Sequence, residues 1–335
     1  MKKSAFVLWS LLGALIPAFA QSQPFSGLQN DFSHVLFNLG EEIVPTIQQN
    51  DLSGVGIGQA TLGKSHFFIS LTAGAVVSNG LLKFRNETDW NTLDIQSLLN
   101  SFVPSSGLGR DLYDLSANIM PYPTVKLAAG VALPWKLELL GAGFYLPQSV
   151  GQALMDVALQ GSNASGSLDA GNFVVRLRRG LLEDQGWTPA LSAGVGYSYS
   201  HLDLAVTLNN FQQLVAGQNV VISGNFAAAT TVNSLGVDVT VSKDLLFVTP
   251  FINAALWYQN ASYDASANLT ATVVTATNNN STALLPSASV RLANWSPIVT
   301  SGFDINLFVL RMLISGQYNL ATGFWGADLS TRVQF

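Results

Sequence analysis

The chain closes with FWGADLSTRVQF, residues 324–335. In a strand, successive side chains point to opposite faces. Trp325, Leu329 and Phe335 would therefore share one face of this segment, and Asp328 and Arg332 would share the other. The first face is apolar and the second is small, polar or charged, and about ten residues suffice for a tilted strand to cross an outer membrane. The segment thus predicts a transmembrane β-strand whose apolar face meets lipid.

The terminal aromatic residue adds a second expectation. The segment resembles the carboxy-terminal strand of bacterial outer-membrane barrels, in which the last aromatic residue serves as an assembly signal. The resemblance implies two partners, which are outer-membrane lipid and the barrel-assembly machinery. The machinery would act through the strand that ends in Phe335.

The amino-terminal sequence predicts export. Lys2 and Lys3 precede an apolar stretch, residues 5–20, which finishes in the cleavage pattern Ala18-Phe19-Ala20. This arrangement is typical of a cleaved signal peptide, and the stretch is too short for a permanent membrane helix. We expect residues 1–20 to be removed and the mature chain to reside in the outer membrane of a Gram-negative-type (diderm) bacterium.

The composition agrees with a barrel in a membrane. Only 10% of the residues are charged, where about 25% is usual, and the mean hydropathy is +0.32. After residue 20 the sequence contains no run of 18 apolar residues, so no membrane-spanning helix is expected. A soluble β-sandwich would also alternate, but so few charges would leave it a sticky surface. Cysteine is absent, so disulfides cannot hold an exported fold together.

The net charge bears on partners. Without Lys2 and Lys3, the chain carries 13 basic and 20 acidic residues, a net charge of −7. Nucleic acid is therefore not expected to bind, because it requires a basic surface.

Residues 21–65 predict a partly helical segment ahead of the strands. Apolar residues recur at steps of three and four, as on one face of a helix. The members of this stripe are Leu28, Phe32, Val35, Leu36, Leu39, Ile43 and Ile47. Asp31 is expected at the first turn of the helix, and Pro45 is expected to bend or end it. Phe32, Leu36, Leu39 and Ile43 are the candidate plug residues, and residues 54–58 are interpreted as a flexible glycine-rich connector.

Residues 66–335 predict the barrel, an all-β antiparallel fold of about 14 strands, with 12 as the alternative. The expected strands are 66–77, 123–133, 136–147, 171–182, 187–199, 201–210, 219–229, 234–243, 246–259, 263–276, 284–294, 298–308, 311–320 and 324–335. Tight turns near residues 134, 184, 244 and 309 would lie in the periplasm, and the long connections 78–122 and 148–170 outside. An even strand number would place both ends of the barrel in the periplasm. If the stretches 199–202 and 210–218 are not turns, two long strands replace four and the count drops to 12.

Charged residues within the strands are expected on the inner face. A basic side chain facing lipid near the midplane costs about 2–4 kcal/mol. The candidate lumen-lining residues are Lys126, Glu138, Arg176, Arg178, Asp238, Arg291, Asp304, Arg311, Asp328 and Arg332. They would either select a solute or stabilise the interior through ion pairs.

No catalytic or metal site is predicted. The histidines are His34, His66 and His201, and none has the spacing of a metal ligand set. His201 and Asp203 would share one face of a strand near the outer rim, but no acidic pair accompanies them, so a polar surface pair is the better interpretation. We expect no enzyme activity and no cofactor.

The layout of signal peptide, amino-terminal segment and about fourteen strands resembles the FadL-type outer-membrane transporters of hydrophobic molecules. In that family an amino-terminal hatch plugs a fourteen-stranded barrel. The family's Asn-Pro-Ala element is missing here, because Asn50-Asp51-Leu52 occupies the comparable region. The resemblance implies passive uptake of a small, hydrophobic solute. Two alternatives remain open, a general diffusion porin and a surface-exposed structural protein or adhesin that uses its outer loops.

Overall fold

A computed structural model describes residues 23–52, 58–62, 67–78, 90, 92, 120–159, 163–215, 218–274 and 279–335. Its helices are α2 (Gln23–Leu52) and α6 (Gln148–Ala158), with a short 3-10 turn η1 (Pro134–Lys136). Its strands are β1 (Phe67–Ser78), β2 (Met120–Leu133), β3 (Leu137–Leu146), β4 (Ala164–Leu182), β5 (Ala190–Val215), β6 (Gln218–Ser242), β7 (Val248–Val274), β8 (Asn279–Leu284), β9 (Ser287–Leu307), β10 (Leu310–Asn319) and β11 (Trp325–Gln334). None of the described helices is long and apolar enough to cross a membrane. The expected signal peptide and most of the connection 78–122 lie outside the described residues.

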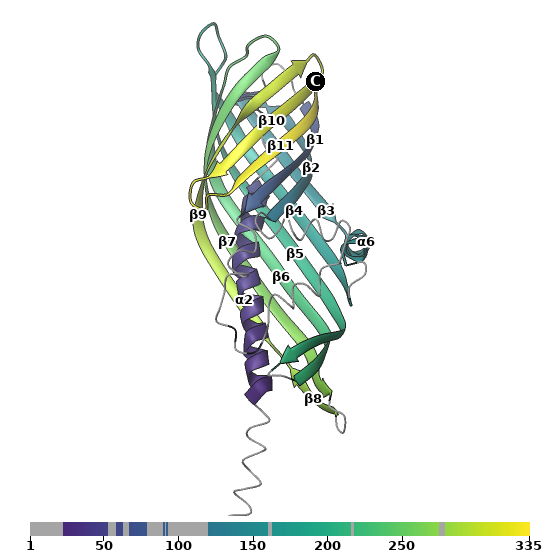
Figure 1. The fold of residues 1–335 in the computed structure, drawn as a ribbon. Coiled ribbons are helices and arrows are strands. Elements are labelled where there is room, and N and C mark those ends of the chain that lie inside the picture. Colours follow the sequence, from purple (N-terminus) through teal and green to yellow (C-terminus); the bar gives the residue numbers. More distant parts are fainter. Residues whose placement is uncertain are drawn as a thin grey trace, which may run out of the picture.

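The strands form a closed antiparallel barrel (Figure 1). Neighbours in sequence pair with one another, and β11 pairs with β1 to close the ring, with Phe68 opposite Gln334. β8 pairs only with β7, in line with β9, from which Leu285 and Pro286 separate it. The described barrel therefore has ten strands in its ring and one extra strand.

The expectation of 14 or 12 strands is wrong, because it divides long strands in two. Four pairs of expected strands are single long strands: 187–199 with 201–210 in β5, 219–229 with 234–243 in β6, 246–259 with 263–276 in β7, and 284–294 with 298–308 in β9. Each of these strands has 21 to 27 residues. Since a membrane requires only about 9–11 residues of a tilted strand, these four extend well beyond it.

The part of the barrel next to the carboxy-terminus has an apolar outer face and a polar inner face, and we call it the membrane storey. On β6, Leu235, Val237 and Val239 are exposed while Asp238 and Thr240 are buried. On β11, Trp325, Leu329 and Phe335 lie on the outside, and Asp328 and Arg332 on the inside. The rim at the carboxy-terminal end carries the short connections 134–136, 183–189, 243–247 and 308–309. These short connections identify it as the periplasmic rim.

A ring of exposed aromatic side chains, the girdle, marks the other limit of the membrane storey. Its members are Tyr145, Tyr199, Tyr258, Trp295, Tyr318 and Trp325. Tyr258 and Trp295 face each other across β7 and β9, with ring centroids 5.2 Å apart. Aromatic residues favour membrane interfaces, and Tyr258 lies about ten residues from the start of β7, which matches the thickness of one membrane.

Beyond the girdle the polarity of the wall is inverted, and we call this part the outer storey (residues 164–171, 200–215, 218–233, 260–274, 279–284 and 287–294). On β7, Asn260, Asp264 and Asn268 now face outward, while Tyr263 and Leu269 face inward. The alternation of each long strand continues, but its apolar residues change faces. This exchange of apolar and polar faces explains the wrong strand count, because each turn that was wrongly expected within a long strand lies at the exchange.

The outer storey is a trough rather than a tube. Residues 164–169 of β4 pair only with β5, and residues 287–297 of β9 pair only with β7. Among the residues that the structure describes, no strand joins β4 to β9 at this level. α6 packs against the free edge of β4, with Gly151 in close contact with the Leu168 carbonyl. Covering an edge in this way keeps its unpaired backbone groups from other chains.

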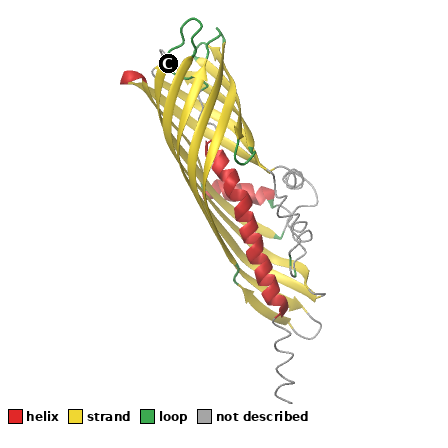
Figure 2. Ribbon diagram, turned by 90° about the vertical axis from the view of Figure 1, so that its left-hand side faces the viewer, coloured by secondary structure: helices red, strands yellow, loops and turns green. Residues whose placement is uncertain are grey.

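α2 lies in this trough and points with its last residues into the closed barrel (Figure 2). Its apolar stripe packs on the inner face of β5 to β9. The helix continues past Pro45 to Leu52, so Pro45 does not end it, which was one of the two expected effects. Asp31 is the ninth residue of the helix rather than part of its first turn, and it accepts hydrogen bonds from the backbone and side chain of Thr92. Tertiary contacts therefore override both local signals.

Candidate functional site: the plugged lumen

The inner face of the membrane storey carries the charges of the strands. Nine of the ten candidate lumen-lining residues lie on it, namely Lys126, Glu138, Arg176, Arg178, Asp238, Asp304, Arg311, Asp328 and Arg332. The alternation of the strands explains this placement, because a position two residues away always returns to the same face.

Arg291 is the exception, and its expected lumenal position is wrong. It lies on the outer face of β9, where it makes a bidentate pair with Asp264 at 3.0 and 2.9 Å. Both side chains are more than half exposed. The position belongs to the outer storey, where the outer face meets water, so a charge there avoids the cost of contact with lipid.

The end of α2 fills the closed part of the lumen. Residues 46–50 are all buried, although they include two glutamines and an asparagine. The wall supplies their partners. Gln259 donates to the Gln48 carbonyl at 2.8 Å, and Lys126 donates to the Asn50 carbonyl at 2.9 Å. Carbonyls of the last helical turn lack partners within the helix and carry the negative end of its dipole, so the Lys126 ammonium stabilises this end.

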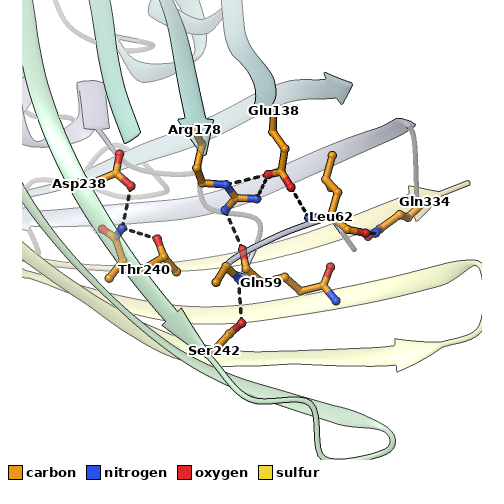
Figure 3. A network of polar contacts seen from close by, with 10 residues as sticks. Gln59, Leu62, Glu138, Arg178, Asp238, Thr240, Ser242 and Gln334 are labelled. Atoms are coloured by element: carbon orange, nitrogen blue, oxygen red, sulfur yellow. Dashed lines mark hydrogen bonds and ion pairs between the residues drawn. The ribbon is translucent and has the colours of Figure 1, made fainter. Parts of the chain in front are cut away.

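A second segment, residues 58–62, crosses the lumen nearer the periplasmic rim (Figure 3). Arg178 donates to the Gln59 carbonyl at 2.7 Å, and the Ala60 amide donates to Ser242 at 2.8 Å. At the other side, the Leu62 amide donates to Glu138 at 2.5 Å. The segment thus spans from β6 across β4 to β3. We call residues 44–50 and 58–62 together the plug.

The pair of Glu138 and Arg178 is the centre of this contact. Arg178 Nε donates to Glu138 Oε2 at 2.8 Å, and both side chains are about 6% exposed. Each residue uses a further atom to hold the plug backbone. Breaking a buried pair from one side costs about 3–5 kcal/mol, because it leaves an uncompensated charge. The pair therefore ties the conformation of residues 59–62 to the wall.

Three other ion pairs join residues of the wall to one another. Asp304 accepts from Arg332 and from Arg311, the latter at 3.4 Å. Arg176 lies 3.9 Å from Asp238 and 5.3 Å from the centroid of the Trp257 ring. Asp238 also accepts from the wall residue Asn253 at 3.2 Å, which makes this pair a natural comparison for Glu138 and Arg178.

The candidate plug residues occupy the trough rather than the closed lumen. Phe32 and Leu36 are buried against the outer storey, and Leu39 and Ile43 pack beside them, partly buried. The closed lumen is filled mainly by polar residues, Thr46, Gln48, Gln49 and Asn50 among them, which the apolar stripe does not include. The usable signal was the unbroken polar run Gln48-Gln49-Asn50 at the end of an amphipathic helix.

A cavity of about 800 Å³ opens at the periplasmic rim. Gln59 and Thr61 of the plug line it, together with Glu138. At its edge, Asp184 accepts hydrogen bonds from Lys243 and, at 2.6 Å, from the Asp244 amide. Partial burial opposes ionisation, but these hydrogen bonds and the Lys243 charge hold the pKa of Asp184 below its usual value. Two rim turns are thereby joined beside the mouth of the cavity.

The pair weighed for catalysis is on the outside of the barrel. His201 Nε2 lies 2.9 Å from Asp169 Oδ1, a partner that the sequence pattern did not reveal, and Tyr145 donates to the other oxygen at 3.2 Å. Asp203 lies opposite Asp169 on β5. The cluster sits by the girdle and away from the lumen. The described residues contain no group of three His, Asp or Glu side chains that is placed to bind a metal ion.

Comparison with known proteins finds similarity only to solved structures, at low identity. No protein-family model and no curated protein sequence matches the chain. Among solved structures, the translocator domain of the autotransporter NalP from Neisseria meningitidis aligns at 11% identity and a TM-score of 0.39, over 86% of this chain and 94% of that one. The outer membrane protease OmpT from Escherichia coli aligns at 11% identity and a TM-score of 0.39, over 81% and 97%. The Ralstonia pickettii toluene transporter TbuX aligns at 9% identity and a TM-score of 0.25, over 82% and 90%. The likeness is one of barrel fold alone.

Proposed function

We propose that this protein is a plugged outer-membrane barrel that mediates passive uptake of a small hydrophobic solute. The observation that carries the proposal is the contrast between the contact of α2 with the trough and the contact of the plug with the closed lumen. The first is apolar, whereas the second is made mainly through hydrogen bonds, with Leu62 as an apolar contact.

The two contacts differ in what replaces them when they break. Four apolar side chains of α2 outside the plug are buried in the trough: Leu28, Phe32, Val35 and Leu36. At about 1.5–3 kcal/mol each, their burial contributes roughly 6–12 kcal/mol, which is lost when they are exposed to water. A hydrogen bond between plug and wall contributes about 1 kcal/mol net, or about 1.5–3 kcal/mol where a charged group takes part, because water replaces it when the plug moves. We therefore expect residues 58–62 and the helix end to move on opening, while the rest of α2 stays anchored.

The lining of the trough supports a hydrophobic solute. Its inner wall is built from Leu208, Ile222 and Leu269, which are buried beneath the apolar stripe of α2. Such a surface favours apolar molecules over sugars or ions. No step of this passage requires a cofactor.

Conductance in planar bilayers tests the plug. We expect low conductance from the intact protein and a large conductance after deletion of residues 21–60. The double variant Glu138→Gln, Arg178→Gln removes the ion pair that holds residues 59–62, and it leaves neither partner as an unpaired buried charge. It should therefore open the pore in frequent conductance steps. The matched control is Arg176→Gln, Asp238→Asn, which removes a wall pair and should leave the conductance low. Unchanged conductance in both the deletion and the Glu138/Arg178 variant would refute the plug.

Uptake by cells tests the solute. Expression of the protein should speed entry of naphthalene, used as a hydrophobic probe, and should leave entry of a disaccharide unchanged. Equal acceleration of both would favour the diffusion porin. The filled lumen already opposes that alternative, since an open porin should conduct without any change in residues 44–50 and 58–62. No acceleration of either probe would favour a structural or adhesive role.

A further inference from the structure

The direction of α2 has a consequence for the amino-terminal end of the chain. The first turns of the helix contact the parts of the wall farthest from the periplasmic rim. Leu28 packs in one cluster with Phe211 and Val215 at the end of β5 and with Leu284 of β8. The helix thus begins at the outer end of the trough, as Figure 1 shows.

From there the chain runs the whole length of the barrel. Asn50 meets Lys126 in the middle of the membrane storey, and Gln334 near the rim donates to the Leu62 carbonyl at 3.2 Å. β1 then starts at the rim itself, where the Phe67 and Phe335 backbones exchange hydrogen bonds of 3.2 and 2.9 Å. The chain enters the ring from outside and turns back into the wall on the periplasmic side.

The sidedness follows from the connections. The rim beside Phe335 carries connections of two to seven residues. The opposite end carries the long connections 79–119 and 147–163, beside the shorter connections 216–217, 275–278 and 320–324. Short turns lie in the periplasm and long loops outside. The start of β1 and the carboxy-terminus, which are the two ends of the barrel, thus lie together on the periplasmic side, whereas α2 starts on the outer side.

We infer that the barrel carries its own amino-terminal segment through the lumen to the cell surface. α2 cannot pass through lipid, because it is too polar to span a membrane. The ring of strands offers the alternative route. Its inner face presents serine, threonine and glutamine side chains to the passing helix, such as Ser234, Thr240 and Gln259. Hydrogen bonds to these groups exchange readily with water, so they allow movement along the lumen.

The outer storey then stops the movement. Once the stripe of α2 reaches the trough, Phe32 and Leu36 bury in the two large apolar clusters of the outer storey, whereas the apolar clusters around Phe68 and Trp257 in the membrane storey are smaller. The polar lumen and the apolar trough thus have separate roles, passage and arrest. In this arrangement, the first turn of α2 lies at the cell-surface end of the barrel.

Cysteine labelling on living cells tests the inference, and the natural chain contains no cysteine that would interfere. Three single variants of the full-length protein are compared with a bulky maleimide-polyethylene glycol reagent that does not cross the outer membrane. Gln29→Cys reports on the exposed face near the start of α2, Asn268→Cys on the outer face of β7, and Gln185→Cys on the periplasmic turn between β4 and β5. Each variant is first shown to be folded by its heat-modifiable mobility in gels.

We expect Gln29→Cys to react on intact cells to at least half the extent of Asn268→Cys, while Gln185→Cys reacts only after the outer membrane is permeabilised. If Gln29→Cys also requires permeabilisation, the amino-terminal end of α2 is periplasmic and the inference is overturned. Asn30→Cys, which is also exposed, serves as a second position and should give the same result. The outcome is independent of the conductance measurements, since display does not require the pore to open.

Discussion

Trp257 shows how single residues shape the inner wall. Its ring is fully buried on β7 and covers Gly236 on β6 and Gly196 on β5. A Cβ atom would come within 2.4 Å of the ring at Gly236 and within 2.7 Å at Gly196. Because neither glycine has a Cβ atom, the indole lies close against the wall and leaves room in the lumen for the end of α2. Arg176 packs over the ring.

This contact predicts the effect of adding one methyl group. Gly236→Ala should destabilise the barrel by about 1–3 kcal/mol, because the indole or the wall must shift. Unfolding in urea with the protein in lipid vesicles measures this change. Gly316→Ala is the control, since the nearest atom to its Cβ would be 3.8 Å away, and it should alter stability little. Equal effects of the two substitutions would contradict this role of Trp257.

At the scale of the element, the long strands are the informative feature. A strand of 27 residues such as β7 keeps one alternation from end to end, yet its outer face is apolar between the rim and Tyr258 and polar beyond Tyr258. The backbone does not change at that point. The surroundings change instead. Near the rim the outer face meets lipid and the inner face meets the lumen, whereas beyond Tyr258 the outer face meets water and the inner face meets the apolar stripe of α2.

The inversion predicts opposite tolerance for one substitution on one face of β7. Ile252 and Asn260 both point outward, on either side of the girdle residue Tyr258. Ile252→Arg places a charge in the membrane and should cost about 2–4 kcal/mol, whereas Asn260→Arg should cost less than about 1 kcal/mol. Stability in vesicles and the yield of folded protein in the outer membrane measure both. Similar losses for both variants would show that the membrane boundary does not lie at the girdle.

At the scale of the whole molecule, α2 holds the two storeys together. The membrane storey is a closed ring, in which every strand pairs on both sides. The outer storey is an open sheet whose apolar inner face needs the helix as its cover. The helix therefore completes a core in one half of the protein and fills a channel in the other.

This division predicts a local response to loss of helix packing. Leu36→Asp places a charge in the apolar contact with the trough, where Leu36 is 3% exposed. It should raise amide hydrogen exchange in residues 200–215 and 260–274 and leave residues 190–199 protected, because the ring stays closed. Phe37→Asp is the control, as Phe37 is 39% exposed and should have little effect. Equal loss of protection in both storeys would show that they unfold as one unit.

Local sequence patterns predict much of the fold. The alternation in residues 324–335 correctly indicated a two-faced strand, and the apolar steps between Leu28 and Ile47 correctly indicated a helix. The class of fold follows as well, since charged residues that recur every second position must avoid lipid. Such properties depend on neighbours within a few positions, so they are visible without the fold.

Only the tertiary structure decided the number of strands and the path of α2. In the sequence, the point where the apolar residues of a strand change faces resembles a turn. The pairing between strands shows that the strand continues there, as β5 does beside β6 at Tyr199 and Asn233. Likewise, the polar run Gln48-Gln49-Asn50 acquires its role through Lys126, Gln259 and Asn319, which lie far away in the chain. The sequence by itself determined which faces are apolar. Closure of the ring around the helix determined what each face meets, because lipid, water and the lumen are separated only once the barrel has formed.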